Sequence, residues 1–517
     1  MALWLLILIP ILAAPFAWMG EQWSRYAPRW IALGALAVDF LLALLLGGHS
    51  DRVQISGHGV WLVESHLSWI PRWGISLHLG LDGLSLVLIL LTAFVGVVAI
   101  IASWTEIQSR VGLFHCNVLL ALGGVIGVFL AIDLFLFFFF WELMLIPMYL
   151  LIVIWGHAQR RHASFKFFLF TQAGSLVLLV AIVALALLHQ QVTGRPSFDY
   201  GDLMGLPLTT DMARWLMLAF LIGFLVKLPA VPVHTWLPDT YTEAPTGATI
   251  ILAGILAKTG AYGLLRFTIP LFPEVMTEFA PIAMGLGVVG ILYGALLACA
   301  QTDIKRLVAY SSISHMGFIL LGAFAGTELA LQGVVMQMVA HGLSTGGLFL
   351  LAGALEERYQ TREMGQLGGL WGVTPRLATM ALFFACASLG LPGLANFIGE
   401  FLVLFGAYAT QPLMIILASL GMVMAAIYSL GMMQRTFFAR QRDALTAPDL
   451  SNLAFGTVLF IAALQVWLGL YPKMVLTTTR PVMKQLVQPA VASTNPTHLP
   501  SQSLLSSHIV TSQGMTP

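Results

Sequence analysis

Charged side chains and cysteine are both scarce in this chain. Only 9% of its 517 residues are Asp, Glu, Lys or Arg, whereas soluble domains carry about 25%. The net charge of +1 argues against a nucleic-acid partner, which needs a basic surface. The three cysteines, Cys116, Cys299 and Cys386, form no CxxC pair, which predicts no metal or iron–sulfur site and favours packing in apolar segments.

What the chain has instead is apolar sequence, with 59% hydrophobic residues and a mean hydropathy of +0.89. Because a helix needs about 20 apolar residues to cross a bilayer, the sequence predicts an all-α integral membrane protein. The N-terminus has no basic region before its apolar run and is expected to be the first span rather than a signal peptide. About 14 transmembrane helices are expected, at 2–19, 31–48, 83–103, 114–132, 134–155, 165–188, 213–234, 245–266, 281–300, 305–325, 329–354, 376–406, 412–434 and 452–471.

The distribution of basic residues orients these spans. The odd-numbered connections carry most of the Arg and Lys residues, and the even-numbered ones carry few. By the positive-inside rule the odd connections are cytoplasmic, so both termini are predicted outside the cytoplasm. The connection between spans seven and eight is an exception, because it holds Asp239 and Glu243 and no basic residue.

Three segments outside the spans have their own expected structure. The end of the 49–82 connection, GISLHLGLD, alternates apolar residues and predicts a strand or hairpin. Residues 472–490 are expected to form an interfacial helix. The Ser/Thr/Pro-rich segment 491–517 is expected to be a disordered tail after a membrane domain at 1–490.

Two spans are interrupted in the same manner. Lys227-Leu-Pro-Ala-Val-Pro interrupts the seventh, and Gly390-Leu-Pro-Gly interrupts the twelfth. Proline removes backbone donors, so both helices are expected to break. Interruptions five spans apart predict two inverted five-helix repeats, at about 114–266 and 281–434. Two unrelated proline kinks remain the alternative.

Among the charged residues inside predicted spans, four stand out: Glu142, Lys227, Lys258 and Glu400. At the bilayer centre each costs roughly 2.5–3.5 kcal/mol, so each must face protein or water. Lys227 is the expected counter-charge of Glu142, since a pair at ~4 Å gains about 4 kcal/mol at an effective dielectric of ~20. A change in their separation would load or release a proton. A static pair that fixes helix register is the alternative.

Three histidines extend this set. His234 lies in the first broken segment, and His315 and His341 lie inside predicted spans. Imidazole exchanges protons near neutral pH, so with the buried charges the three favour a proton relay. Each is also compatible with a structural role. A bis-histidine haem at His315 and His341 is disfavoured, because nothing in their spacing requires it.

Several motifs then resemble one family. Residues 227–266, KLPAVPVHTWLPDTYTEAPTGATIILAGILAKTGAYGLLR, resemble the signature of the antiporter-like subunits of respiratory complex I. The motifs FFFFWELMLIPMYLLI, DIKRLVAYSSISHMG and GLPGLANFIGEFLVL also match. The resemblance extends over nearly all of the chain except the tail. The glutamate in the twelfth span differs from the lysine of the sister subunits L and N.

The resemblance implies a proton path. Glu142 and Lys227 would be the coupling pair of the first half-channel, and Lys258 the central relay. His234, His315 and His341 would assist, and Glu400 would open the exit. This chain would hold no cofactor, with FMN, iron–sulfur clusters and quinone on partner subunits. The fold would have fourteen helices, with helices 7 and 12 broken.

The same resemblance implies the surroundings of the protein. It would be a multi-pass subunit of the bacterial inner membrane with periplasmic termini. Its partners would be the lipid bilayer and other membrane-arm subunits, including subunits L and N. The motifs leave two other assemblies open, a multisubunit sodium/proton antiporter and a proton-pumping hydrogenase.

Overall fold

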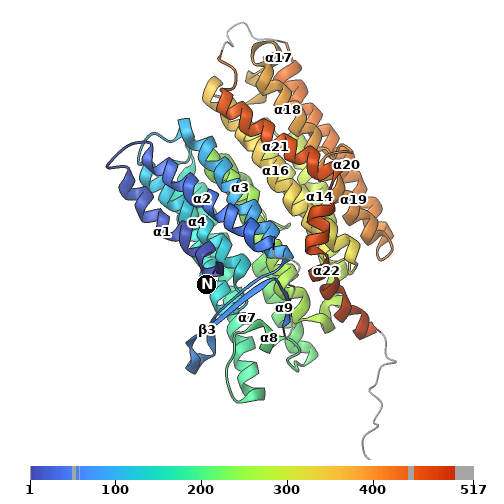
Figure 1. Ribbon diagram of the computed structural model, residues 1–517. Helices are drawn as coiled ribbons and strands as arrows, with labels where there is room; N and C mark the ends of the chain where they lie inside the picture. The colour runs from blue at the N-terminus through green and yellow to red at the C-terminus, as the bar shows by residue number, and fades with distance from the viewer. Residues whose placement is uncertain (1, 49–53, 57–58, 441–446, 495–517) are drawn as a thin grey trace, which may run out of the picture.

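The computed structural model describes residues 2–48, 54–56, 59–440 and 447–494. The N-terminal quarter consists of four long helices and two small antiparallel sheets. In Figure 1 these helices form one side of the molecule, in blue and cyan. The elements are α1 Ala2–Gly20, α2 Ala27–Gly47, β1 Gln54–Ser56, β2 Gly59–Trp61, β3 Val63–Ile70, the 3-10 turn η2 Pro71–Trp73, β4 Ile75–Leu81, α3 Gly83–Glu106 and α4 Val111–Leu130.

The middle of the chain contains the first interrupted helix and a long helix with π-helical segments. In Figure 1 its labelled helices α7, α8 and α9 lie toward the bottom of the molecule. The elements are α5 Leu134–Leu143, α6 Leu145–Trp155, α7 Arg160–Thr193, α8 Tyr200–Leu203, α9 Thr210–Lys227, α10 Trp236–Glu243, α11 Thr246–Ile251, π-helical η3 Leu252–Leu256, α12 Ala257–Gly263, π-helical η4 Leu264–Thr268 and α13 Ile269–Leu271.

The C-terminal part forms the other side of the molecule, in yellow to red in Figure 1. The elements are α14 Pro273–Ala300, α15 Ile304–Ala323, α16 Glu328–Tyr359, the 3-10 turn η5 Met364–Gln366, α17 Leu370–Val373, α18 Pro375–Ser388, α19 Ala395–Tyr408, α20 Pro412–Met433, π-helical η6 Gln434–Phe438, α21 Asn452–Leu470 and α22 Lys473–Thr494.

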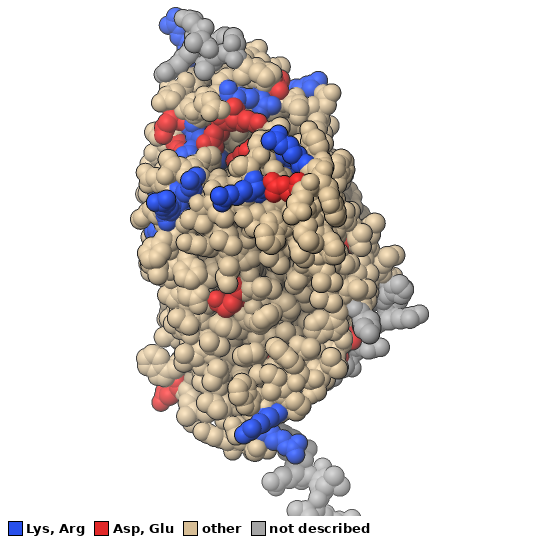
Figure 2. Space-filling model, turned by 90° about the vertical axis from the view of Figure 1, so that its left-hand side faces the viewer, with Lys and Arg blue, Asp and Glu red and all other residues tan. Residues whose placement is uncertain are grey.

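The predicted membrane architecture is confirmed. Eleven helices of the described chain are long and apolar enough to cross a membrane. The three remaining predicted spans coincide with α9, α15 and the α18–α19 pair. The total of fourteen spans stays a prediction. Figure 2 shows the charged side chains gathered mainly toward one end, beside a broad and almost uncharged belt.

Both predicted helix interruptions are present. The helix α9 ends at Lys227, and residues 228–235 form turns before α10 begins at Trp236. The helix α18 ends at Ser388, and residues 389–394 separate it from α19. Pro229 and Pro232 in one break and Pro392 in the other cannot donate backbone hydrogen bonds, which accounts for both positions.

The hairpin predicted before the third span is also present. The strand β4 pairs antiparallel with β3, and Gly74 closes the turn in the left-handed region at φ +67°. Helix α22 occupies the segment expected to be helical and contacts α3, α14 and α16. It continues to Thr494, past the expected start of the tail, and residues 495–517 lie outside the described residues.

Two isolated β-bridges occupy related positions. Asp133, which precedes α5, bridges Asp199, and Asp303, which precedes α15, bridges Glu363. Both Asp133 and Asp303 also cap their helices, by accepting backbone N–H bonds within the first turn. In each case the bridge joins the start of one span to the connection after the next span. Two inverted repeats predict such correspondence, and the repeats themselves stay a prediction.

Candidate proton-transfer site

Lys258 lies on α12 and is fully buried. Its helix, from α11 to α13, is buried almost throughout, and the Lys258 side chain is 0% exposed. The Lys258 ammonium donates to the Ala253 carbonyl and contacts His341 Nδ1 at 2.7 Å. Ala253 belongs to the π-helical segment η3. Because π-turns change the backbone bonding pattern, this segment offers the ammonium a carbonyl acceptor inside the helix bundle.

His341 leads from Lys258 to a second histidine. The rings of His341 on α16 and His315 on α15 meet edge to face, with their centres 5.4 Å apart. His315 Nδ1 donates to Glu400 Oε1 at 2.8 Å. Lys258, His341, His315 and Glu400 therefore form one buried row across four helices, which we call the central chain. The structure brings together four of the seven predicted site residues here.

Three further polar groups hold the Glu400 end of the central chain. Gln337 Nε2 donates to Glu400 Oε1 at 3.1 Å. Ser388 Oγ and the Tyr428 hydroxyl approach His315 Nε2 at 3.2 and 3.4 Å. With Nδ1 protonated toward Glu400, a neutral His315 ring presents Nε2 as an acceptor to both hydroxyls.

Sequence reasoning did not select these three supporting residues. Gln337 precedes His341 by four residues, so the two lie on the same face of α16. Ser388 is the last residue before the second helix break. Both positions, Gln337 relative to His341 and Ser388 relative to the break, can be read from the sequence. The position of Tyr428 on α20 depends on helix packing and had no comparable signal.

Glu142 and Lys227, the expected coupling pair, are not hydrogen-bonded to each other through Glu142 Oε1 in the described chain. No hydrogen bond reaches Lys227 Nζ or Glu142 Oε1 within the described chain, and no ion pair of 4.0 Å or less joins them. Lys227 Nζ instead lies over the Trp141 ring, 4.2 Å from its centre. The Glu142 charge still acts electrostatically on Lys227. Glu142 is partly exposed, whereas Lys227 is buried.

His234 lies apart from the central chain. It follows the α9 break and packs edge to face on Tyr293, with ring centres 5.5 Å apart. Its Nδ1 is buried and has no hydrogen-bond partner among the residues that the structure describes. His234 is therefore not linked by a direct contact to the other predicted site residues.

A network of ion pairs lies in the odd-numbered connections and at the span ends beside them. Its members come from the connections after spans five, seven, nine and eleven. Glu243 and Asp239, the acids of the exceptional connection, meet basic partners from its neighbours, which explains why that connection needs no Lys or Arg. This ion-pair network consists of Lys166–Asp239, Arg306–Asp239, Arg362–Asp303, Arg362–Glu243, Arg362–Glu356 and Lys305–Glu356.

His157 borders this network outside the spans. Its Nε2 lies 3.3 Å from Lys305 Nζ, and its Nδ1 lies 3.5 Å from Glu356 Oε1. Burial, and then the positive charge of Lys305, lower the pKa of His157 to about 4. Desolvation disfavours the charged imidazole, so His157 is neutral at physiological pH and accepts a hydrogen bond from Lys305.

The fold and the central chain define a class of protein: a polytopic membrane protein with interrupted helices and protonatable side chains in contact through its interior. Ionisable groups at this depth mark proton or ion pathways in membrane proteins. Residues 131–426 match the family described as NADH:quinone oxidoreductase/Mrp antiporter, TM. The chain belongs to this family.

Two relatives show which members of the family this chain resembles. The NADH-quinone oxidoreductase subunit M of Pseudomonas aeruginosa is 51% identical over 481 residues, which cover 91% of this chain and 94% of the relative. The subunit M of Escherichia coli K12 is 48% identical over 494 residues, with 93% and 97% covered.

Solved structures share the architecture. A chain of respiratory complex I from Thermus thermophilus with bound NADH is 33% identical, with a TM-score of 0.85, and the match covers 95% of this chain and 100% of that one. A chain of the Mrp complex from Dietzia sp. has a TM-score of 0.83 at 22% identity, with 95% and 98% covered. The likeness to the Mrp complex chain shows a shared fold and nothing more.

Proposed function

We propose that this chain is a proton-translocating membrane subunit of a bacterial NADH:quinone oxidoreductase. The central chain carries the proposal, because Lys258, His341, His315 and Glu400 place protonatable groups in a row through the apolar interior. Relatives about half identical over nearly the whole chain are named subunit M of this enzyme.

Within this proposal, Glu142 and Lys227 accept the proton in the first half of the molecule. Lys258 passes it to His341 by direct contact. The next step passes between the His341 and His315 rings, whose centres lie 5.4 Å apart. His315 then exchanges the proton with Glu400, where the path leaves the central chain. His234 has an auxiliary role beside the first helix break.

Redox chemistry belongs to partner subunits in this proposal. FMN, iron–sulfur clusters and quinone are bound there, and coupling reaches this chain through its membrane-arm neighbours, including the sister subunits L and N. The chain itself would carry out the proton-translocation step. Moving each proton against 100 mV requires about 2.3 kcal/mol, which must arrive as a conformational change from those neighbours.

The proposed location is the bacterial inner membrane, with both termini in the periplasm. The concentration of charge at one end of the molecule in Figure 2 supports this orientation. The location of the ion-pair network on odd-numbered connections supports it as well. The paired bridges at Asp133 and Asp303 support two inverted repeats at about 114–266 and 281–434 within a membrane domain at 1–490.

Two experiments test the proposal. The first isolates the complex that contains this chain from native membranes: NADH oxidation with flavin and iron–sulfur clusters is expected, and their absence would favour a sodium/proton antiporter. The second measures NADH-driven proton uptake in vesicles. Glu142→Ala and Lys227→Ala are expected to assemble but to lose most pumping. Normal pumping by assembled Glu142→Ala complexes would leave the pair with a structural role only.

A further inference from the structure

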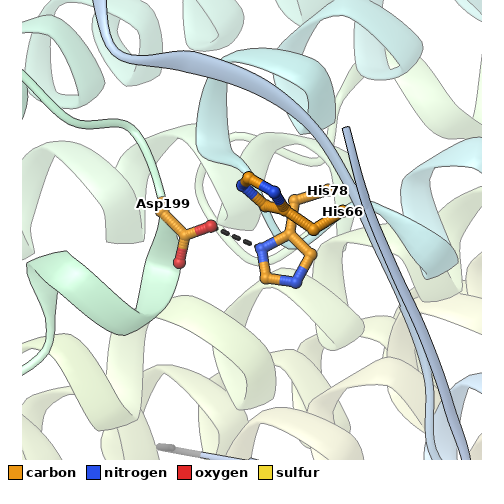
Figure 3. Close-up of side chains that lie close together, drawn as sticks. All are labelled: His66, His78 and Asp199. Carbon is orange, nitrogen blue, oxygen red and sulfur yellow. Dashed lines mark hydrogen bonds and ion pairs between the residues drawn. The ribbon is translucent and has the colours of Figure 1, made fainter. Parts of the chain in front are cut away.

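A second group of polar side chains lies far from the central chain, on the β3–β4 hairpin. His66 and His78 are directly opposite each other in the antiparallel pairing. Residues paired in this manner point to the same face of a sheet, and the two rings meet edge to face with their centres 4.9 Å apart. Figure 3 shows Asp199, from the connection before α8, facing the same point as both rings.

The ligand-type atoms of these three residues converge. One atom each from His66, His78 and Asp199 lies within 4.8 Å of the other two, and Asp199 Oδ2 hydrogen-bonds His78 Nδ1. Nitrogen and oxygen ligands at about 2.0–2.2 Å from a tetrahedral Zn²⁺ lie about 3.4 Å apart. His66 is exposed, so binding an ion would require its ring to turn closer to the other two ligand atoms.

Asp199 is held in place by the surrounding backbone. Its Oδ1 accepts from the Gly201 N–H and caps α8, which leaves Oδ2 toward the histidines. The connection that carries Asp199 is fastened to the hairpin, because the Phe198 N–H donates to the Gly74 carbonyl at 3.2 Å. Preformed ligands of this kind lower the cost of binding a metal.

Glu64 supplies an orienting contact. Glu64 Oε1 lies 2.7 Å from His78 Nε2. When Nε2–H donates to Glu64, Nδ1 carries the free lone pair, and that is the nitrogen beside Asp199. Histidines that ligate zinc typically donate their other ring N–H to a carboxylate in this manner.

The group also borders a route for ions from solvent. A cavity of about 500 Å³ is lined by His66, Asp199, Asp202 and Arg195, among others. Three protein ligands with an open fourth position are typical of zinc sites that keep a bound water. Imidazole with carboxylate favours Zn²⁺ over Mg²⁺ or Ca²⁺, which take oxygen ligands.

We propose that His66, His78 and Asp199 form a binding site for a divalent transition metal, Zn²⁺ foremost, with Glu64 positioning His78. The ion would join the connection between α2 and α3 to the connection between α7 and α9. This site differs from the sequence-based expectation, which placed no metal in the chain. The alternative occupant is a proton shared between His78 and the two carboxylates.

The test uses the full chain in its purified native complex, stripped with chelator and titrated with ZnCl₂ alone. Bound zinc is counted by mass spectrometry after desalting, and thermal unfolding is followed at each concentration. Wild type is expected to bind one zinc more than His66→Ala and to gain thermal stability with zinc. His66→Ala is suitable because the side chain is exposed, and it is expected to weaken binding by more than about tenfold.

His189→Ala is the matched control, since His189 lines the same cavity outside the proposed ligand set. It is expected to bind zinc like wild type, and NADH oxidation is expected to be unchanged in both variants. Equal zinc binding by wild type and His66→Ala would overturn the proposal in favour of a hydrogen-bonded cluster. An equal loss in His189→Ala would overturn this assignment of the ligands.

Discussion

His315 donates from Nδ1 to Glu400 Oε1 at 2.8 Å, and this contact joins two helices from different parts of the second half of the chain. Both side chains are buried, with 3% and 1% of the residues exposed. Glu400 follows the break that separates α18 from α19. The break therefore places a titratable carboxyl group where a histidine of an unbroken helix can reach it.

Replacing Glu400 by glutamine is expected to stop proton exchange while the local packing survives. The amide oxygen still accepts from His315 and Gln337, but it cannot take up a proton. NADH-driven pumping in vesicles should fall below about a tenth of wild type, since positioned proton-transfer groups contribute about 100-fold or more. Glu400→Lys is the companion variant: retained pumping there would mean that any protonatable group suffices.

Lys258→Met is expected to abolish pumping and leave assembly intact. Methionine fills a similar volume without a charge, so the Ala253 carbonyl and His341 Nδ1 lose their shared donor. Lys258→Arg, which keeps a cation that does not release its proton, should also pump poorly. Both variants are compared in vesicles that contain equal amounts of complex. Wild-type pumping by Lys258→Met would remove Lys258 from the path.

The sequence could predict the interruptions and part of the hairpin, because proline, glycine and alternation act locally. It could not predict the Lys258–His341 contact, which depends on the π-helical segment η3 and on how η3 packs against α16. The sequence suggested Glu142 as the counter-charge of Lys227, which stays a prediction, but it could not show that the Trp141 ring lies against the Lys227 ammonium. The cluster around Asp199 was missed for a similar reason, since its members lie in different connections. One signal was present: His66 and His78 lie at equal spacing on either side of Arg72 in the turn.

Arg362→Ala is expected to destabilise the end of the molecule that carries the ion-pair network. The guanidinium pairs with Asp303, Glu243 and Glu356, so its loss leaves three carboxylates with fewer partners. The arginine side chain is 18% exposed. The free energy of unfolding is therefore expected to fall by about 2–3 kcal/mol, less than the ~3–5 kcal/mol lost when a fully buried pair is broken. Thermal unfolding in detergent measures this, with the exposed Arg161→Ala as control. Equal losses in the two variants would contradict a special role for the network.

Because the pKa of His157 is lowered in the folded protein, the protein is expected to lose stability in mild acid. The pKa of His157 in the folded protein is about 4, and the unfolded value is about 6.5. Between these values the unfolded state binds more protons, so the free energy of unfolding falls as the pH is lowered from about 6.5 toward 4. The charged groups facing the ring, Lys305, Glu356 and Arg362, stay the same in His157→Gln. That variant should lose less stability than wild type between pH 7 and pH 5, and parallel profiles would refute the assignment.

Trp141 is expected to stabilise the Lys227 ammonium through its aromatic ring, rather than through the hydrogen bond that its indole N–H donates. The ring centre lies 4.2 Å from Lys227 Nζ, and the indole N–H donates to Ser175 Oγ at 3.0 Å. A desolvated cation–π contact is worth about 2 kcal/mol, and Lys227 has no hydrogen bond in the described chain to replace it. Trp141→Leu should therefore favour the uncharged amine and slow pumping severely. Trp141→Phe retains an aromatic face and Ser175→Ala retains the whole ring, so both should pump much better than Trp141→Leu. If all three variants pump alike, the charge of Lys227 does not depend on the ring, and proton loading must be controlled by Glu142 alone.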